Sequence, residues 1–460
     1  MPAFAHYCFI YNYIHMTTQA IINVADATQA PAPFNVFTAR QFDKIPQLND
    51  LPDELVHDMK VVSAVLPFRV NQYVIDYLID WQNPIEDPIF QLTFPQRGML
   101  KPEHFTRVEK AMASGDKVQI KQVVEEVRET LNPHPAGQLE HNIPRVNGEP
   151  VNGIQHKYHE TVLFFPSSGQ VCHSYCTFCF RWAQFVGDQS LKIAAKESSQ
   201  LCDYLREHTE VTDVLITGGD PMVMKTKNLR AYLEPLLQPE FDHIRTIRFG
   251  TKALTFWPYR FVTDPDAPEL LALFREIIAA DKHVAFMAHY NHWRELETSI
   301  ARQAVQVIRE TGAQIRSQGP LLNHINNSAD DWARLWQTQV ELGIHPYYMF
   351  VERDTGAQHY FEVPLAKAWK IYRQAMRQVS GIARTARGPS MSATPGKVEI
   401  QGVTEINGEK VFVLRFIQGR NPDWVQRPFF AKYDEKATWL DHLKPAFGEE
   451  KFFFETETNL

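Results

Sequence analysis

Residues 170–182 read QVCHSYCTFCFRW and hold Cys172, Cys176 and Cys179, three of the chain's five cysteines. A disulfide framework uses cysteines in pairs, and a closed structural zinc site uses four ligands. Three thiolates suit an iron–sulfur cluster in which one iron is left free for another ligand. Small core residues on one helical face are the structural alternative, but the flanking PSSGQ and TFCFRW favour a loop. We therefore interpret the segment as a cluster-binding loop.

The overall composition is that of a globular protein. The chain has 460 residues, of which 44% are hydrophobic and 22% charged, enough for a sizeable core. A net charge of −7 argues against general binding to nucleic acids or membrane surfaces. No stretch offers the ~18 consecutive apolar residues that a membrane span needs. The few cysteines, odd in number, fit a reducing cytoplasm, which is the location we expect.

Six strand-then-helix units follow one another between residue 160 and about residue 380. Their β-rich runs are TVLFF (161–165), DVLITGG (213–219), TIRFGT (246–251), HVAFMAHY (283–290), AQIRSQG (313–319) and HPYYMFV (345–351). This alternation predicts an α/β fold with a parallel sheet and outer helices, whose chemistry gathers at the carboxyl ends of the strands. Six units are too few for an eight-stranded barrel, so we predict a partial (β/α)6 barrel, with a doubly wound sheet as the alternative.

The regions on either side of these units differ in composition. We predict a mainly helical N-terminal region at 1–155, the barrel at 156–385 and a C-terminal region at 386–460. Within the last, EIQGVTEINGEKVFVLRF (399–416) predicts a hairpin with Asn-Gly at its turn. The aromatic tail beyond it would cover the open side of the barrel or contact another subunit, and the sequence does not choose between these.

A second motif lies one unit after the cysteine loop. ITGGDP places Gly218, Gly219 and Asp220 at the end of the second predicted strand, where glycines allow a ligand to approach the backbone closely. A plain tight turn is the structural alternative. The cysteine loop and the glycine pair together resemble the radical S-adenosylmethionine superfamily. That superfamily has a Gly-Gly-Glu element at the position of Gly218, Gly219 and Asp220. From about residue 60 to 400 the chain is similar to the lysine 2,3-aminomutase family, in the order of HKYHETVLFF, CTFCFR, VLITGGDP, IRFGTK, RSQGPLL, HPYYMF and PGK.

The resemblance implies a radical isomerase. In this family a [4Fe-4S] cluster cleaves S-adenosylmethionine to a 5'-deoxyadenosyl radical, and pyridoxal phosphate holds the migrating nitrogen as an imine during a 1,2-amino shift. The three cysteines would bind the cluster. Contacts with S-adenosylmethionine carry over to Gly218, Gly219, Asp220, His289 and Gln318, although polar core groups are an alternative reading for the last two.

Two basic residues match the family's site for substrate and pyridoxal phosphate, and a third replaces an arginine there. Arg181 matches the arginine that pairs with the substrate carboxylate. Lys397 in ATPGKV matches the Schiff-base lysine, against the alternative of a solvated surface charge. Lys157 stands where the family has an arginine near the cofactor phosphate, and Thr161 stands where it has a second one.

Three departures from the family pattern stand out. The glycine run before the lysine is shortened to TPGK, which weakens the expected binding of pyridoxal phosphate. The two aspartates that grip the distal ammonium of lysine are replaced by Asn327 and by Glu352 or Arg353. Because an unpaired buried charge costs about 3–5 kcal/mol, we expect a substrate other than lysine. Cys8 and Cys202 have no partner nearby in sequence, so no zinc site is expected.

Three functions remain open at this level. The first is an aminomutase that acts on an amino acid other than lysine. The second is a radical enzyme on this scaffold that works without pyridoxal phosphate. The third is a non-enzymatic iron–sulfur electron carrier, which the glycine-pair motif disfavours because a carrier needs no cofactor pocket. For the enzymes we expect a small-molecule substrate, an electron donor such as flavodoxin or ferredoxin, and a homo-oligomer.

Overall fold

The computed structural model describes residues 33–133, 142–146, 148–186 and 193–457. Cys8 lies outside the described residues. The elements named below all belong to the compact unit Phe34–Leu460.

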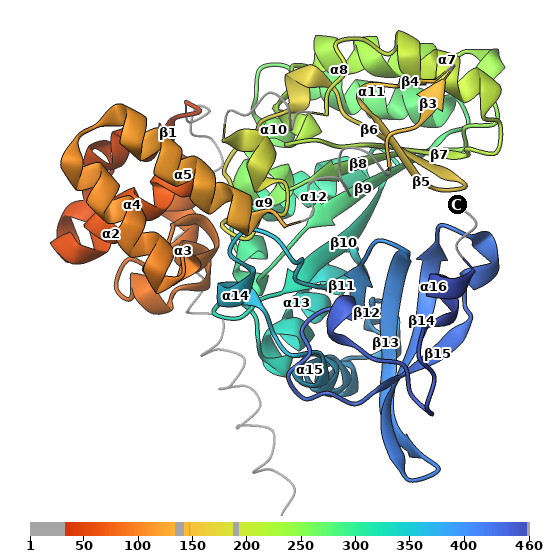
Figure 1. Ribbon diagram of the computed structural model, residues 1–460. Helices are drawn as coiled ribbons and strands as arrows, with labels where there is room; N and C mark the ends of the chain where they lie inside the picture. Colours follow the sequence, from red (N-terminus) through yellow and green to blue (C-terminus); the bar gives the residue numbers. More distant parts are fainter. Residues whose placement is uncertain (1–32, 134–141, 147, 187–192, 458–460) are drawn as a thin grey trace, which may run out of the picture. The chain divides into compact units, whose positions relative to one another are not determined.

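An eleven-stranded sheet organises this unit, and its strand order is β15-β14-β13-β12-β11-β10-β9-β8-β7-β6-β5 (Figure 1). Neighbours are parallel from β6 to β12 and antiparallel at both ends. The strands are β5 (Ile154–Tyr158), β6 (Thr161–Phe164), β7 (Asp213–Ile216), β8 (Thr246–Thr251), β9 (His283–His289), β10 (Gln314–Leu321), β11 (His345–Val351), β12 (Arg387–Ser392), β13 (Gly396–Ile406), β14 (Glu409–Gly419) and β15 (Pro428–Lys432).

The six predicted strands are confirmed as β6 to β11, and the fold is mixed α/β. Strand order rises without a reversal from β5 to β15. A doubly wound sheet requires a point at which the order reverses, so that alternative is excluded. One parallel strand, β12, was not predicted: it lies where the sequence suggested only a C-terminal region.

Helices connect the parallel strands and cover them with apolar faces. They are α7 (Ser199–Glu207), α8 (Thr226–Leu233), α11 (Ala267–Ala279), α12 (Ser299–Arg309), α13 (Ala329–Glu341) and α15 (Leu365–Gln378). Side-chain caps fix where two of them begin, because Thr298 accepts from Ala301 N and Ser328 accepts from Asp331 N. Leu270, Leu273 and Phe274 of α11 are fully buried in one core with the strand residues.

The segment before the sheet is built mainly from helices: α2 (Asp53–Val65), α3 (Pro88–Thr93), α4 (Pro102–Ser114) and α5 (Lys117–Leu131), with the short strands β1 (Val36–Thr38) and β2 (Arg69–Asn71). Asp87 caps α3 by accepting from Ile89 N and Phe90 N at 2.8 and 2.7 Å. The apolar core of this segment includes Phe178 and Trp182. The helices therefore pack against the cysteine loop.

The C-terminal hairpin β13–β14 has the predicted turn, with Asn407 and Gly408 at φ 52° and 80°. In Figure 1 its tip extends beyond the neighbouring strands. Phe429, Phe452 and Phe454 of the following segment pack in one core with Phe416 of β14. The aromatic tail thus covers strands of its own chain.

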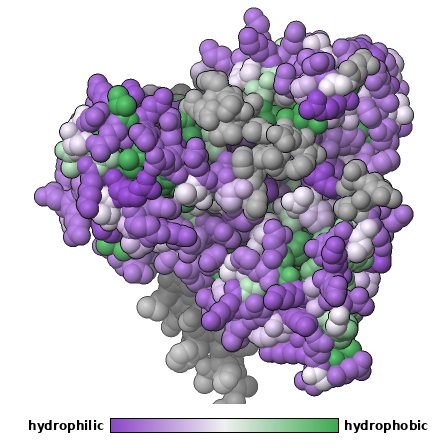
Figure 2. Space-filling view, viewed as in Figure 1, coloured by the Kyte–Doolittle hydropathy of each residue, from purple (hydrophilic) through white to green (hydrophobic). Residues whose placement is uncertain are grey.

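The face shown in Figure 2 is mostly polar, with apolar side chains in small groups. Across the described ranges, no helix combines the length and the apolar character that crossing a membrane requires.

Candidate functional site

Two adjoining cavities bring most of the predicted site residues together. The first, here called the thiol cavity, has a volume of about 280 Å³ and is lined by the three cysteines of the loop and by the Gly218–Gly219 pair. The second, the lysine cavity, has about 220 Å³ and is lined by Lys157 and Lys397. Seven residues line both: Leu163, Phe180, Arg181, Leu215, Gln318, Arg353 and Ser392.

The cysteine loop lies between β6 and α7, where it was predicted, and residues 171–180 contain no helix. The N-terminal segment holds it in place. Tyr175 N donates to Arg69 O at 2.8 Å, Thr177 N donates to Leu92 O at 2.9 Å, and Asn71 N donates to Ser174 Oγ at 3.1 Å. Because these bonds satisfy loop backbone that lacks a helical partner, β2 and α3 fix the loop's conformation.

All three thiols are free, and burial raises the pKa of each. For Cys179 the value is about 11. The pKa of Cys172 is raised further by Asp220 and by the other two thiols, and all three thiols line the same cavity. Half-buried neutral thiols with no covalent partner are groups that a metal would deprotonate and bind.

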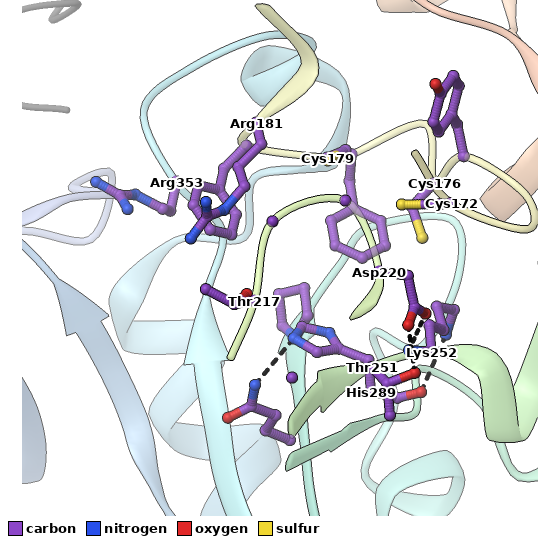
Figure 3. A pocket seen from close by; sticks show the side chains of 18 of the residues that line it. Cys172, Cys176, Cys179, Arg181, Thr217, Asp220, Thr251, Lys252, His289 and Arg353 are labelled. Carbon is purple, nitrogen blue, oxygen red and sulfur yellow. Dashed lines mark hydrogen bonds between the residues drawn. The ribbon is translucent and has the colours of Figure 1, made fainter. Parts of the chain in front are cut away.

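The donor set fits an iron–sulfur cluster better than a single metal ion. Among the described residues, no three His, Cys, Asp or Glu side chains are arranged around one ion position. In a four-iron cluster each cysteine binds a different iron, so the thiols need not converge on one point. Figure 3 shows Cys172, Cys176 and Cys179 along one wall, with Asp220 below them.

The glycine pair allows the end of β7 to press against the cysteine loop. A Cβ on Gly219 would lie 2.5 Å from Val171 N, and one on Gly218, whose φ is 144°, would lie 2.2 Å from the side chain of Gln170. Asp220 N also donates to Val171 O at 2.9 Å. The pair therefore has a packing role in addition to lining the thiol cavity.

Asp220 is fully buried, and its carboxylate bonds to the end of β8. It accepts from Thr251 Oγ1 at 2.7 Å and from Lys252 N at 2.9 Å (Figure 3). Burial raises the pKa of Asp220 to about 6, against the lowering effect of these bonds. Its side chain thus ties the loop after β7 to the loop after β8.

His289 and Gln318, at or near the carboxyl ends of β9 and β10, lie side by side on the cavity wall. His289 Nε2 is 3.0 Å from Gln318 Nε2. Burial, together with the charges of Lys252 and Arg181, lowers the pKa of His289 to about 3, so the ring is neutral. Lys252, which sequence reasoning missed, donates to Glu295 Oε1 at 2.6 Å and to Asn291 Oδ1 at 2.9 Å.

Arg181 lines both cavities, and Figure 3 shows its side chain near that of Arg353. Its guanidinium is 4.4 Å from the ring centre of Phe165. Within the described ranges its side chain forms no hydrogen bond and no ion pair. Burial lowers the pKa of Arg181 to about 10, and Arg353 contributes to the lowering. A half-buried cation that has no counterion among the described residues is suited to binding an anion.

The two residues of VERD considered for the distal site both line the thiol cavity. Glu352 is buried, and burial raises the pKa of its carboxyl well above the usual value. Arg353 also lines the lysine cavity, stacks on Phe180 at 5.0 Å, and has a buried Nε without a hydrogen-bond partner.

Asn327, the other residue predicted for the distal site, does not lie with Glu352 and Arg353. It lines neither cavity, and its Nδ2 donates to Asn323 Oδ1 at 2.5 Å near the start of α13. The preceding Asn326 fixes this turn by accepting from Leu322 N at 2.7 Å and donating to Asn291 O at 2.8 Å. A substrate site that includes Asn327 is therefore not assembled in this structure.

Cations dominate the lysine cavity. Among the described residues that line it, five are basic and none is Asp or Glu: Lys157, Arg181, Arg248, Arg353 and Lys397. Lys157 Nζ donates to Ala393 O at 2.5 Å, and burial lowers its pKa well below the usual value. This charge excess suits an anionic group such as the phosphate of pyridoxal phosphate, although TPGK is short of glycines.

Lys397 is held at the centre of this cavity. Its Nζ donates to Gln418 Oε1 at 3.0 Å and lies 4.1 Å from the ring centre of Tyr348. Burial, together with the nearby charges of Arg248 and Arg387, lowers the pKa of Lys397 to about 7. A large fraction of the amine is thus uncharged and nucleophilic at neutral pH. These contacts do not fit the alternative of a solvated surface charge.

Several lining residues had no signal in the sequence. Gln418, Arg248 and Tyr348 reach the lysine cavity from β14, β8 and β11, which are far apart along the chain. Lys252 lies within the stretch IRFGTK, which drew attention only as a family match. Asn71 acts on the cysteine loop from β2, and nothing in its local sequence marks it.

No family model matches the chain. It is 30% identical over 404 residues to a putative L-lysine 2,3-aminomutase of Aquifex aeolicus, covering 88% of this chain and 95% of that protein. It is 28% identical to the L-lysine 2,3-aminomutase of Escherichia coli, covering 55% of this chain and 70% of that protein. With the enzyme of that name from Acetoanaerobium sticklandii the identity is 26%, over 50% and 52% of the two chains.

Solved structures show only a weak likeness. Streptococcus suis SuiB bound to S-adenosylmethionine has a TM-score of 0.34 and 13% identity, over 56% of this chain and 49% of that one. A radical SAM methyltransferase from Sphaerobacter thermophilus has a TM-score of 0.34 and 13% identity, over 51% and 68%. These two similarities are too weak to support a conclusion. The match to the Aquifex aeolicus protein supports one, because it spans almost the whole of that protein and extends through the cysteine loop, the glycine pair and Lys397. The chain belongs to the lysine 2,3-aminomutase family of radical S-adenosylmethionine enzymes.

Proposed function

We propose that this enzyme moves an amino group between adjacent carbons of an amino acid other than lysine, with pyridoxal phosphate as second cofactor. One observation carries the proposal: the thiol cavity and the lysine cavity share seven lining residues, with Arg181 among them. A substrate anchored by its carboxylate at Arg181 would be in reach of both cavities.

In this proposal the cofactors supply the reactive chemistry. A [4Fe-4S] cluster with S-adenosylmethionine supplies the radical that abstracts hydrogen, and pyridoxal phosphate supplies an aldehyde that bonds the substrate nitrogen. The protein's part is binding and orientation. Cys172, Cys176 and Cys179 would hold the cluster, with Gly218, Gly219, Asp220, His289 and Gln318 around S-adenosylmethionine. Lys397 would hold pyridoxal phosphate, and Lys157 its phosphate.

Arg181 would bind the α-carboxylate in a bidentate contact, which a planar guanidinium favours. The rings of Phe165 and Phe180 lie 4.4 and 5.2 Å from the guanidinium. They keep water from competing for the charge, which strengthens the ion pair because the local dielectric is low. We propose that this contact sets the position of the substrate between the two cavities.

The side-chain end of the substrate would meet Arg353 and Glu352. Arg353 has a buried Nε without a partner, and burial favours the neutral form of Glu352. A cationic ammonium would therefore be repelled by the first and gain little from the second. We propose an acidic or amide side chain for the substrate, and poor binding of lysine.

A substrate panel tests this proposal. Reduced enzyme is incubated with S-adenosylmethionine, pyridoxal phosphate and single amino acids, and β-amino products and 5'-deoxyadenosine are measured. Lysine should be converted at least about a hundredfold more slowly than the best acidic or amide substrate, since an unpaired buried charge costs about 3–5 kcal/mol. Fast conversion of lysine to β-lysine would overturn the substrate assignment.

A second function is favoured by two features of the lysine cavity. Thr161 stands where the family has an arginine, and the glycine run before Lys397 is short. A radical enzyme that abstracts hydrogen without pyridoxal phosphate would account for both. Turnover that survives both omission of pyridoxal phosphate and the change Lys397→Ala would favour this alternative. A non-enzymatic electron carrier is less compatible with the two cavities.

Further features of the enzyme belong to the same proposal. We propose that the parallel strands curve as a partial barrel around the thiol cavity, which is supported by lining residues from β6 to β12. We also propose the division at 155 and 385, a flavodoxin or ferredoxin as electron donor, a homo-oligomeric assembly and a cytoplasmic location. Spectral assay of cluster reduction by each donor and sedimentation of the protein test two of these.

A further inference from the structure

Gln418 of β14 is the hydrogen-bond partner of Lys397 of β13. The two residues face each other in the register of the hairpin, and Gln418 Oε1 accepts from Lys397 Nζ at 3.0 Å. Both side chains line the lysine cavity. At Gly396, just before Lys397, a Cβ would lie 2.3 Å from Gln418 O. The two strands therefore approach closely where the amine is held.

The surroundings of the amine contain cations and rings from every neighbouring element. Arg248 comes from β8, Arg387 from β12 and Lys157 from β5. The charges of Arg248 and Arg387 lower the pKa of Lys397. The charge of Lys397 in turn lowers the pKa of Lys157. From β11, Tyr348 lies under the amine, 4.1 Å away, and Phe350 lies at 5.5 Å. Arg248 is itself paired with Asp213 at 2.7 Å. No carboxylate among the described residues is paired with Lys397.

We propose that Gln418 is the positioning residue of Lys397: it holds the amine toward the cavity with a neutral oxygen, so that the lysine is oriented without being paired to an anion. The role deepens the proposed function, because it serves the same lysine. A carboxylate at this position would orient the amine equally well but would stabilise its protonated form. The amide satisfies both needs at once, orientation and an uncharged amine.

Charge and geometry can be separated with two variants of Gln418. The change Gln418→Glu keeps the size and the acceptor and adds a negative charge. The change Gln418→Ala removes the acceptor and adds no charge. Gln401→Glu is the matched control, since Gln401 is exposed on the same hairpin and lines neither cavity. Thermal melts of each variant confirm that the fold is retained.

The first readout needs no bound cofactor. Trace acetylation of Lys397 by acetic anhydride is measured by mass spectrometry across pH, and its midpoint gives the pKa of the amine. Gln418→Glu should raise this pKa by about 1–3 units, the usual effect of an adjacent opposite charge. Gln401→Glu should leave it within about 0.3 unit of the unmodified protein, as expected for an exposed distant charge.

The second readout tests orientation. Protein is incubated with pyridoxal phosphate at pH 7, reduced with borohydride, and the label on Lys397 is quantified. Gln418→Ala should lower the label at least fivefold while acetylation by the small reagent continues. The proposal would be overturned if the pKa of Lys397 in Gln418→Glu were no higher than in the Gln401→Glu control. It would also be overturned if Gln418→Ala took up as much pyridoxal phosphate label on Lys397 as the unmodified protein. If the unmodified protein takes up no label, the use of pyridoxal phosphate in the proposed function fails, and the acetylation result alone decides the role of Gln418.

Discussion

The two cavities are built in opposite ways. The thiol cavity takes its three sulfur atoms from one short loop, whose conformation is irregular and held by hydrogen bonds from β2 and α3. The lysine cavity takes most of its polar groups from regular strands, among them β5, β8, β11 and the β13–β14 hairpin, while Arg181 and Arg353 come from loops. A loop can gather identical ligands closely but needs external support. Strands hold single side chains rigidly, so each group must come from a different part of the chain.

The largest expected effect tests the loop. Replacing Cys172, Cys176 or Cys179 with Ala should abolish the oxygen-sensitive iron–sulfur absorbance and S-adenosylmethionine cleavage, because among the described residues no other thiol lines the cavity to replace the lost ligand. Iron content and the visible spectrum of anaerobically purified protein measure this. Cys202→Ala is the control, since Cys202 belongs to α7, is buried in the core and lines neither cavity, so its loss should leave the cluster in place. A single loop variant with its full cluster would refute the assignment.

The next effect tests the lysine cavity. Lys397→Ala should reduce turnover that depends on pyridoxal phosphate to background while the cluster spectrum is unchanged, because in the proposed function the two cavities bind different groups. Product formation and the visible spectrum are measured on the same sample. Lys432→Ala, at an exposed position on β15, should have neither effect. Loss of the cluster in Lys397→Ala would show that the cavities are not separable.

Arg181, one of the seven residues that line both cavities, should have an intermediate effect. Arg181→Lys keeps the charge but loses the planar fork, so one charged hydrogen bond to the carboxylate is lost. Since such a bond contributes about 1.5–3 kcal/mol, the substrate concentration at half-maximal rate should rise roughly ten- to hundredfold. Steady-state kinetics with the best substrate of the panel measures it. An unchanged value would place the carboxylate elsewhere.

The smallest effect concerns stability. Burial lowers the folded-state pKa of Lys397 from 10.5 to about 7. As pH falls from about 10.5, the unfolded chain binds the proton first, so this lysine destabilises the fold increasingly down to about pH 7. Lys397→Met should therefore raise the free energy of unfolding at pH 6.5 by about 1–2 kcal/mol. The full pKa shift would correspond to about 5 kcal/mol, but Lys397 is only half-buried and solvent screens part of the effect. The gain should shrink at pH 9.5. Urea unfolding at both pH values measures it, and a gain that grows with pH would contradict the burial argument.

The contrast between the cavities explains which features could be predicted from the sequence. Cys172, Cys176 and Cys179 lie close together along the chain, so their spacing alone indicated a cluster. The strands β6 to β11 were also found, because each is a short apolar run followed by a helical segment. Lys397 and Arg181 came from the resemblance to the family, and only the structure shows their burial.

Other features had no sequence signal. The neutral acceptor Gln418 meets Lys397 only through the register of the hairpin. The seventh parallel strand β12 was missed because its sequence RGPSMS has few of the apolar residues that mark a strand. Asn327 was matched by position in the chain, yet the turn fixed by Asn326 directs it away from both cavities.

The order of residues along the chain has a consequence for biosynthesis. At the usual 5–20 residues per second, the cysteine loop leaves the ribosome on the order of ten to forty seconds before the β13–β14 hairpin. During that interval the N-terminal segment that supports the loop has already been synthesised. The strands β13 and β14, which line the lysine cavity together with Arg181, have not. The nascent chain thus contains its cysteine loop before β13 and β14 supply Lys397 and Gln418, so the lysine cavity is the later of the two to be completed.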